Sequence, residues 1–324
     1  MALIGWFPRD RWSSGRLHRS IGAQRRPIWP QDPPPAFLNS VSRETIEPSV
    51  TGPKGGKLVH LTLPDGTRIG ALVARVTACT NQKGGVGKTT TVINLAAYLA
   101  LAGTRTLVID LDPQGNASTG LGADRRAPGT IYDALIDRVP LSEIARPTAI
   151  RGLELVTATP ELAGAEVELV GLPAREHRLA ASLAEVDQRY DRVLVDCPPS
   201  LGLLTVNALT AADGVLIPIQ AEYYAMEGLG NLVNTIRLVR GSLNPRLEIE
   251  GVVITMFDRR TRLSAQVADE VRRHLNGAVY DTVVPRSVRL SEAPSHGLPI
   301  ALYDPSSRGA FAYQALAAEV ATRG

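Results

Sequence analysis

The 324-residue sequence contains only two cysteines, three methionines and 5% aromatic residues. The two cysteines, Cys79 and Cys197, lie far apart in separate apolar runs, so the sequence offers neither a disulfide framework nor the ligand spacing of a zinc site. We expect both to be buried, reduced thiols. This use of cysteine predicts a cytoplasmic protein.

A long hydrophobic run is also missing. A membrane-spanning helix needs about 18 or more consecutive apolar residues, and no stretch of the sequence approaches that length. The apolar opening, residues 1–7, is too short for the apolar region of a secretory signal, and arginines follow it instead of a small-residue cleavage site. The sequence therefore predicts no membrane association.

The net charge is small, +3 in total, but it is unevenly distributed. Residues 1–74 carry ten Lys and Arg against five Asp and Glu, whereas residues 75–324 carry 25 against 27. A second local excess lies between Arg259 and Arg289, where seven arginines accompany three acidic residues. This window is a candidate anion-binding surface, although solvated arginines without a ligand would give the same pattern.

Composition divides the chain into three parts. Residues 1–57 hold eight of the 23 prolines and show no helical or strand periodicity, which predicts a disordered, basic extension. Residues 58–74 contain two apolar stretches around Pro64-Asp65-Gly66, the pattern of a β-hairpin with an Asp-Gly turn. Residues 75–324 are long enough to form one large domain with its own core.

From residue 75 onward, short apolar runs alternate with amphipathic stretches. This alternation predicts an α/β domain with a mostly parallel sheet flanked by helices. Strands are expected at residues 76–80, 106–110, 153–157, 192–196, 214–218, 249–256 and 278–284. Helices are expected at residues 89–102, 161–170, 175–188, 203–211, 226–240, 264–275 and 307–322.

One glycine-rich segment stands directly between the first of these strands and the first helix. It reads Asn81-Gln82-Lys83-Gly84-Gly85-Val86-Gly87-Lys88-Thr89-Thr90. In such a phosphate-binding loop (P-loop), glycines let backbone N–H groups turn around an anion, and the helix N-terminus adds its dipole. Lys88 can reach the terminal phosphates of ATP, and Thr89 offers a hydroxyl to Mg²⁺. We therefore expect ATP to contact residues 83–90, with Mg²⁺ as the second cofactor.

The segment departs from the strict P-loop pattern in one respect. Gln82 stands where the first glycine belongs, and Lys83 precedes the ordinary lysine, Lys88, by five residues. This run resembles the deviant P-loop, KGGVGKT, of the partition ATPase family that includes ParA, Soj and MinD. The resemblance implies a P-loop NTPase fold and a catalytic Lys83 that reaches the nucleotide of a partner subunit. ATP binding, formation of a homodimer and hydrolysis would thereby be coupled.

Three aspartates at strand ends complete the expected catalytic centre. Residues 193–196 are an apolar strand that ends in a carboxylate, as a Walker B segment does, so Asp196 is expected to hold Mg²⁺ directly or through water. Asp110 and Asp112 end an earlier strand. The resemblance assigns Asp112 to orienting the attacking water and Asp110 to the surroundings of the metal.

Residues 284–297 resemble the segment that lines the adenine pocket in partition ATPases. The resemblance makes Pro285 and Ser287 the expected base contacts, although Asn is common in the family at the position of Ser287. A surface loop shaped by its prolines is the alternative interpretation.

The resemblance extends over nearly all of residues 75–324. The runs Gln220–Leu229 and Tyr303–Ala310 are more similar to chromosomal ParA and Soj than to MinD. The resemblance implies that Arg260 and Arg289 bind double-stranded DNA without sequence preference once ATP has joined two subunits. It also implies a ParB-like partner that stimulates hydrolysis and a nucleoid-associated location.

Other functions on the same fold remain alternatives. A MinD-like positioning ATPase would bind a membrane surface, yet the apolar face of the expected C-terminal helix has few basic residues beside it. That face comprises Phe311, Tyr313, Leu316, Ala317 and Val320. A small-molecule ligase such as an amidotransferase would need further catalytic residues, and a nitrogenase-type iron protein would need cluster-ligand cysteines. A regulator that binds ATP with little turnover would have no need of Asp112.

Overall fold

The computed structural model describes residues 57–62, 68–124, 126–186, 188–222, 225–275 and 277–323. The chain divides into two units, Met1–Glu47 and Pro48–Gly324. The first unit, and almost all of the predicted extension at residues 1–57, lies outside the described residues. The second unit contains all the helices and strands that the structure describes.

The hairpin expected at residues 58–74 coincides with two antiparallel strands. Strand β1 (Lys57–Thr62) pairs with β2 (Arg68–Val73), with Lys57 opposite Val73. These strands form a two-stranded sheet of their own. The Asp-Gly turn expected between them lies outside the described residues.

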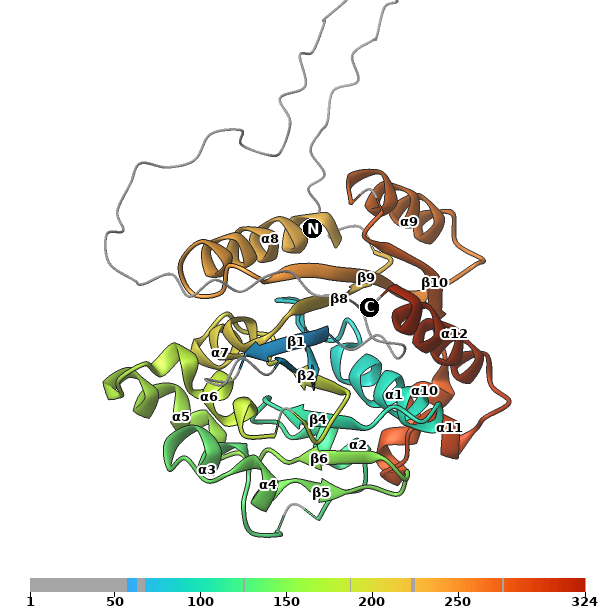
Figure 1. Cartoon of the computed structure of the whole chain (residues 1–324). Helices are drawn as coiled ribbons and strands as arrows, with labels where there is room; N and C mark the ends of the chain where they lie inside the picture. The colour runs from blue at the N-terminus through green and yellow to red at the C-terminus, as the bar shows by residue number, and fades with distance from the viewer. Residues whose placement is uncertain are drawn as a thin grey trace, which may run out of the picture. The chain divides into compact units, whose positions relative to one another are not determined.

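The centre of the fold is an eight-stranded sheet in the order β10-β9-β8-β3-β7-β4-β6-β5 (Figure 1). Its strands are β3 (Arg75–Cys79), β4 (Thr106–Asp110), β5 (Arg146–Pro147), β6 (Leu153–Val156), β7 (Arg192–Asp196), β8 (Gly214–Gln220), β9 (Glu248–Phe257) and β10 (Val279–Pro285). Neighbouring strands run parallel except at the edge, where β5 is antiparallel to β6. The prediction of a mostly parallel sheet is therefore confirmed.

Helices cover both faces of this sheet. One face carries α3 (Ile131–Ile136), α4 (Leu141–Ile144), α5 (Leu162–Glu168), α6 (Arg178–Ala184), α7 (Leu203–Ala211), α8 (Ala225–Ser242) and α9 (Arg262–His274). The other carries α1 (Lys88–Leu101), α2 (Asn116–Gly120), α10 (Val288–Glu292), α11 (Ile300–Tyr303) and α12 (Arg308–Arg323). Single 3₁₀ turns lie at η1 (Leu169–Gly171), η2 (Arg175–His177) and η3 (Ala293–His296). Because strands β4 and β7 are buried on both faces, their central residues form apolar runs rather than an alternating pattern.

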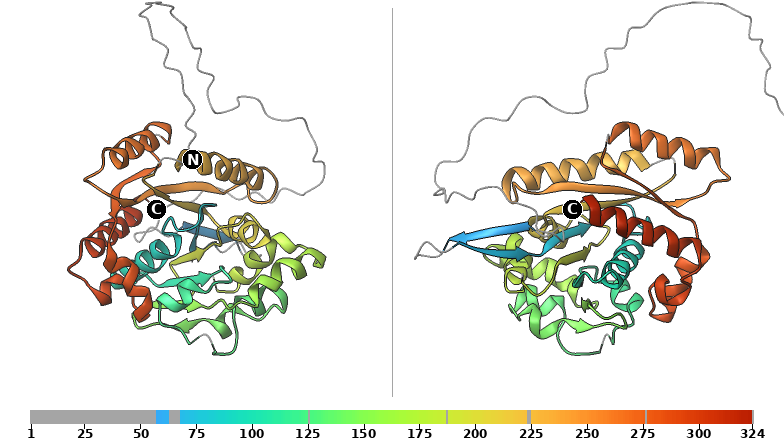
Figure 2. Two further views of the ribbon diagram at one scale, coloured as in Figure 1. Left: turned by 180° about the vertical axis from the view of Figure 1, so that it is seen from behind. Right: turned by 45° about the vertical axis from the view of Figure 1, so that its right-hand side comes forward.

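The C-terminal helix α12 packs beside α1, as the right-hand view of Figure 2 shows. Tyr313, Leu316 and Val320 are buried there, and the Tyr313 hydroxyl lies 3.2 Å from the hydroxyl of Thr91 in α1. Phe311 was expected on the same face but is 58% exposed. The helical repeat explains the difference, because two residues before Tyr313 is roughly the opposite side of a helix. In the part of the chain that the structure describes, no helix is both long and apolar enough to cross a membrane.

The strand order determines where a ligand can bind. Strand β3 lies between β7 on one side and β8 on the other, so the chain leaves the carboxyl end of β3 where the winding changes direction. Open parallel sheets bind ligands at such a point. The loop after β3 and the carboxyl ends of β4 and β7 meet at this edge.

Candidate ATP-binding site

The predicted P-loop connects β3 to α1, and its glycines have the backbone conformation that the loop requires. Gly85 has φ 73° and Gly87 has φ 88°, values in the left-handed region that favours glycine. Helix α1 begins at Lys88, directly after Gly87. Gly84 and Gly85 are exposed, Val86 and Lys88 are buried, and Thr89 and Thr90 are half-buried. The expected loop therefore lies at the N-terminus of a 14-residue helix.

Hydrogen bonds from neighbouring strands hold the P-loop in place. Thr255, near the end of β9, donates from Oγ1 to the Val86 carbonyl over 2.7 Å. The Asn81 side chain donates to the Pro218 carbonyl in β8 over 2.7 Å and accepts from the Lys83 N–H over 3.0 Å. The loop is thus fixed by both strands on that side of β3 before any phosphate binds.

Two aspartates stand side by side at the carboxyl edge. Asp110 ends β4, Asp196 ends β7, and the two pair in the parallel register. Both are fully buried. Asp110 accepts hydrogen bonds from the N–H and the hydroxyl of Ser118, each 2.7 Å long, and from the N–H of Asp112. Burial nevertheless raises the pKa of Asp110 to about 6, against the effect of Ser118.

Asp196 differs from Asp110 in having no such support. Among the residues that the structure describes, no donor stands in hydrogen-bonding geometry to either carboxylate oxygen. Burial raises the pKa of Asp196 well above its ordinary value, and the charge of Asp110 adds to the rise. The nearby Thr89 hydroxyl and the Lys88 ammonium act in the opposite direction.

A buried carboxylate without donors beside a P-loop fits a bound cation. In the described part of the chain, no group of three or more His, Cys, Asp or Glu side chains could hold a metal ion by itself. Mg²⁺ in nucleotide sites takes only one or two protein ligands and completes its shell with phosphates and water. The pair Thr89 and Asp196 fits that arrangement.

Asp112 lies in the turn that follows β4. Its carboxylate accepts a hydrogen bond from the Gln114 N–H over 3.0 Å, and the residue is buried. This contact orients the side chain within its own turn. The predicted catalytic aspartate is thus two residues after Asp110 and at the same edge of the sheet as the P-loop.

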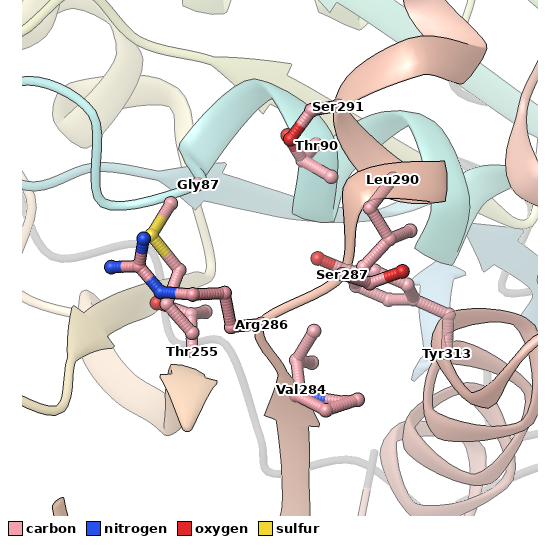
Figure 3. Close-up of a pocket in the computed structure, with 11 residues that line it drawn as sticks. Gly87, Thr90, Thr255, Val284, Arg286, Ser287, Leu290, Ser291 and Tyr313 are labelled. Atoms are coloured by element: carbon pink, nitrogen blue, oxygen red, sulfur yellow. The ribbon is translucent and has the colours of Figure 1, made fainter. Parts of the chain in front are cut away.

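A cavity of about 190 Å³ adjoins the start of α1 (Figure 3). It is lined by Gly87, Thr90, Thr255, Met256, Val284, Pro285, Arg286, Ser287, Leu290, Ser291 and Tyr313. Pro285 and Ser287, the expected base contacts, are therefore brought to the P-loop. Ser287 precedes α10, and its side chain makes no capping bond, which leaves the hydroxyl available to a ligand.

Sequence reasoning missed several residues at the site. Thr255, Met256 and Tyr313 line the cavity, and Met256 has φ 50°, an uncommon conformation for a residue other than glycine. Glu222 follows β8 and lies 3.4 Å from the ammonium of Lys83. The rule that ligands bind at carboxyl ends of parallel strands would have flagged Thr255 and Glu222, because each is near such an end.

The two predicted DNA-binding arginines lie on separate segments. Arg260, in the turn before α9, pairs with both carboxylate oxygens of Asp258. Arg289, on α10, pairs with Glu292 over 3.0 Å and with Asp304 over 3.4 Å. Each arginine thus has acidic partners of its own.

Known proteins share this fold and this site region. A family model described as an AAA domain matches residues 74–249. Soj of Bacillus subtilis strain 168, a sporulation initiation inhibitor protein, is 55% identical over 253 residues, which cover 78% of this chain and 100% of Soj. The chromosome partitioning protein ParA of Myxococcus xanthus is 54% identical over 259 residues, which cover 80% of this chain and 92% of ParA.

A solved structure is also similar. Cobyrinic acid a,c-diamide synthase from Mycobacterium smegmatis, with bound ADP and magnesium, matches with a TM-score of 0.67 and 38% identity, over 76% of this chain and 93% of that chain. Soj and ParA are closer in sequence, and they match over almost their whole length. The chain therefore belongs to the family of Soj and ParA chromosome-partitioning ATPases, P-loop proteins that use ATP and Mg²⁺.

Proposed function

We propose that this protein is an ATP-driven switch in the partitioning of chromosomes or plasmids. ATP and Mg²⁺ join two subunits into a homodimer, the homodimer binds double-stranded DNA, and hydrolysis separates the subunits again. The observation that carries the proposal is the fully buried Asp196 carboxylate, which has no partner in hydrogen-bonding geometry among the described residues and lies beside the P-loop that holds Lys83 and Lys88.

The Thr89 hydroxyl and Asp196 would hold Mg²⁺ together with phosphate oxygens of ATP. Bound there, the ion would neutralise charge on the phosphates during transfer. Asp110 would stand behind Asp196 without contacting the ion, because its oxygens already accept hydrogen bonds from Ser118 and Asp112. Its task in this proposal is to fix the turn that carries Asp112.

The two lysines have different tasks. Lys88, buried at the start of α1, binds the phosphates of its own nucleotide, and the P-loop N–H groups from Gly84 to Thr90 cradle them. Lys83 has a half-exposed side chain, 3.4 Å from the Glu222 carboxylate, and would reach the nucleotide of a second subunit. Charge supplied from a partner to a phosphoryl transition state is worth roughly 10³ to 10⁵ in rate in comparable systems. Asp112 orients the attacking water.

The base of ATP enters the cavity between α1 and α10. Pro285 supplies an apolar surface, and the free hydroxyl of Ser287 supplies a polar contact. The cavity that would bind the base is lined in part by Gly87 of the P-loop, which would bind the phosphates. The base and the phosphates would therefore occupy one continuous nucleotide site.

DNA binding follows from pairing of subunits. Arg260 and Arg289 are both exposed, at 89% and 57% of the side chain, so a phosphate can replace their carboxylate partners. A homodimer would present two copies of each arginine. These would bind the DNA backbone without sequence preference, and the binding would weaken as the salt concentration rises. A ParB-like partner then stimulates hydrolysis, and the protein is found on the nucleoid in the cytoplasm.

The alternatives fit the observations less well. A MinD-like protein would need a free amphipathic helix for the membrane surface, whereas the apolar residues Tyr313, Leu316 and Val320 of α12 are buried against the domain. A ligase function rests on the 38% identity to the diamide synthase, and the relatives at 54–55% identity are named for sporulation and partitioning.

A binding titration tests this function. Full-length protein would be titrated with duplex DNA of arbitrary sequence in the presence of ATP, ADP or no nucleotide, at two salt concentrations. Binding with ATP alone, weaker at the higher salt, is expected. Equal binding in all three conditions, or none with ATP, would contradict the proposal, and ATP-dependent co-sedimentation with anionic vesicles would favour the MinD-like alternative.

A further inference from the structure

We infer that Glu222 is a positioning residue for Lys83: its carboxylate holds the lysine beside its own loop in a single subunit, and this ion pair must open before two subunits can pair. The inference rests on the proposed function, because it concerns the step that brings Lys83 to a partner. In this proposal Glu222 binds the catalytic Lys83 side chain until ATP and a second subunit are present.

One carboxylate joins three segments of the site. Glu222 follows the end of β8, and its Oε2 lies 3.4 Å from Lys83 Nζ in the P-loop. Its Oε1 lies 3.7 Å from the guanidinium of Arg286, in the loop after β10, and also accepts a hydrogen bond from the Gln220 amide. Lys83 and Arg286 are thus gathered around the same acidic group.

The backbone of Lys83 is fixed, so its side chain alone is free to redirect. Its N–H donates to Asn81 over 3.0 Å, and its carbonyl accepts from Lys88 Nζ over 3.4 Å. Reaching a partner therefore requires rotation of the Lys83 side chain away from Glu222. The strength of the ion pair with Glu222 therefore determines how often the Lys83 side chain can reach a second subunit.

Exposure sets the strength of this contact. The side chains of Lys83, Glu222 and Arg286 are 40%, 46% and 62% exposed. Ion pairs at such positions are weak because water screens them, whereas buried pairs are costly to break. The polyphosphate of a second subunit's ATP carries several negative charges and can displace one half-exposed carboxylate. The ion pair with Glu222 thus favours the position of Lys83 beside its own loop, and ATP of a second subunit can still displace it.

Arg286 links the same contact to the nucleotide. It lines the cavity that adjoins the P-loop (Figure 3). Its guanidinium also pairs with Glu222. Without the negative charge of Glu222, the two cations would repel each other, and Lys83 would leave its own loop more readily. Removing that charge should therefore favour pairing of subunits.

The test is an ATP titration of subunit pairing by light scattering, on wild type, Glu222→Gln and Glu222→Asp. Glu222→Gln keeps the side-chain length and removes the charge, so half-maximal pairing should need about two- to fivefold less ATP than in wild type. Glu222→Asp keeps the charge but withdraws it by one methylene, so its value should lie between the two. Pairing with ADP should stay absent in all three proteins, since Lys83 then lacks its target.

Glu176→Gln is the matched control. Glu176 forms a partly exposed ion pair with Arg175 on η2, so this variant changes the total charge equally but leaves Lys83 untouched. Its titration should coincide with wild type, and melting temperatures should agree for all variants. If Glu222→Gln pairs at the wild-type ATP concentration or needs more, the holding role is wrong while the proposed switch survives. If wild type itself does not pair with ATP, both are wrong.

Discussion

Asp110 and Asp196 occupy paired positions at the ends of β4 and β7, so two fully buried carboxylates lie side by side at the edge where the P-loop begins. Hydrogen bonds from Ser118 support Asp110, whereas Asp196 has no donor in the described part of the chain. Two like charges in a buried site are unfavourable until a cation enters. Bound Mg²⁺ would therefore offset the repulsion between these two carboxylates.

This arrangement predicts an unusual pH dependence of stability without nucleotide. Asp110 has a pKa of about 6 in the folded chain and an ordinary value of 3.8, so between these values the folded state retains a proton that the unfolded state has released. The contribution of this group to stability therefore falls as the pH rises from about 4 to about 6.5 and then stays constant. The rise in pKa corresponds to about 3 kcal/mol when complete.

Thermal melts of Asp110→Asn and wild type at pH 4.5 and 7.5 would check this. Because the variant cannot ionise at this position, its stability relative to wild type should increase toward pH 7.5. A difference between the two proteins that does not change with pH would show that the Asp110 carboxylate is not the group responsible.

Ser287→Ala should weaken ATP binding with little effect on the maximal rate. The hydroxyl lines the cavity and makes no capping bond, and loss of one hydrogen bond corresponds to about a two- to tenfold weaker affinity. ATP titrations by calorimetry and steady-state kinetics would measure both quantities. Ser295→Ala is the control, because its hydroxyl bonds to the Glu292 carbonyl and does not line the cavity.

Arg289→Ala should reduce DNA affinity and its salt dependence together. Each lost phosphate contact lowers the slope of log affinity against log salt by about 0.9, so a homodimer should lose about two units. Arg246→Ala removes the same charge from an exposed position before β9 and should leave the slope unchanged. If both variants lose DNA affinity and salt dependence equally, the net charge of the protein, and not a defined surface around Arg289, determines DNA binding.

Buried apolar runs made the sheet predictable. The expected strand at residues 106–110 and the expected helix at 203–211 agree with β4 and α7 residue for residue, and the remaining expected strands agree within about two residues. Motif spacing located the P-loop and the strand-end aspartates. Each of these features depends on a short contiguous segment, which is the range over which sequence patterns are informative.

Features that depend on distant contacts were not predictable from the sequence. The helix expected at residues 175–188 is divided into η2 and α6, and the short helices α2, α3, α4, α10 and α11 and the edge strand β5 were missed. Helix α3 did carry a signal, because Thr130 and Asp133 form a capping box. The pairing of Lys83 with Glu222 brings together residues 139 positions apart, which no local pattern contains.

Mixing two inactive variants tests most directly whether Lys83 acts on the nucleotide of the partner subunit. Lys83→Ala subunits retain Asp112, and Asp112→Ala subunits retain Lys83. A dimer with one subunit of each variant therefore has one complete site only if Lys83 reaches the active site of the partner subunit. ATP hydrolysis should then recover to about a quarter of the wild-type rate, since half of the pairs are mixed and one of their two sites is complete. If the mixture hydrolyses ATP no faster than either variant alone, or if Lys83→Ala alone retains the wild-type rate, the account is contradicted.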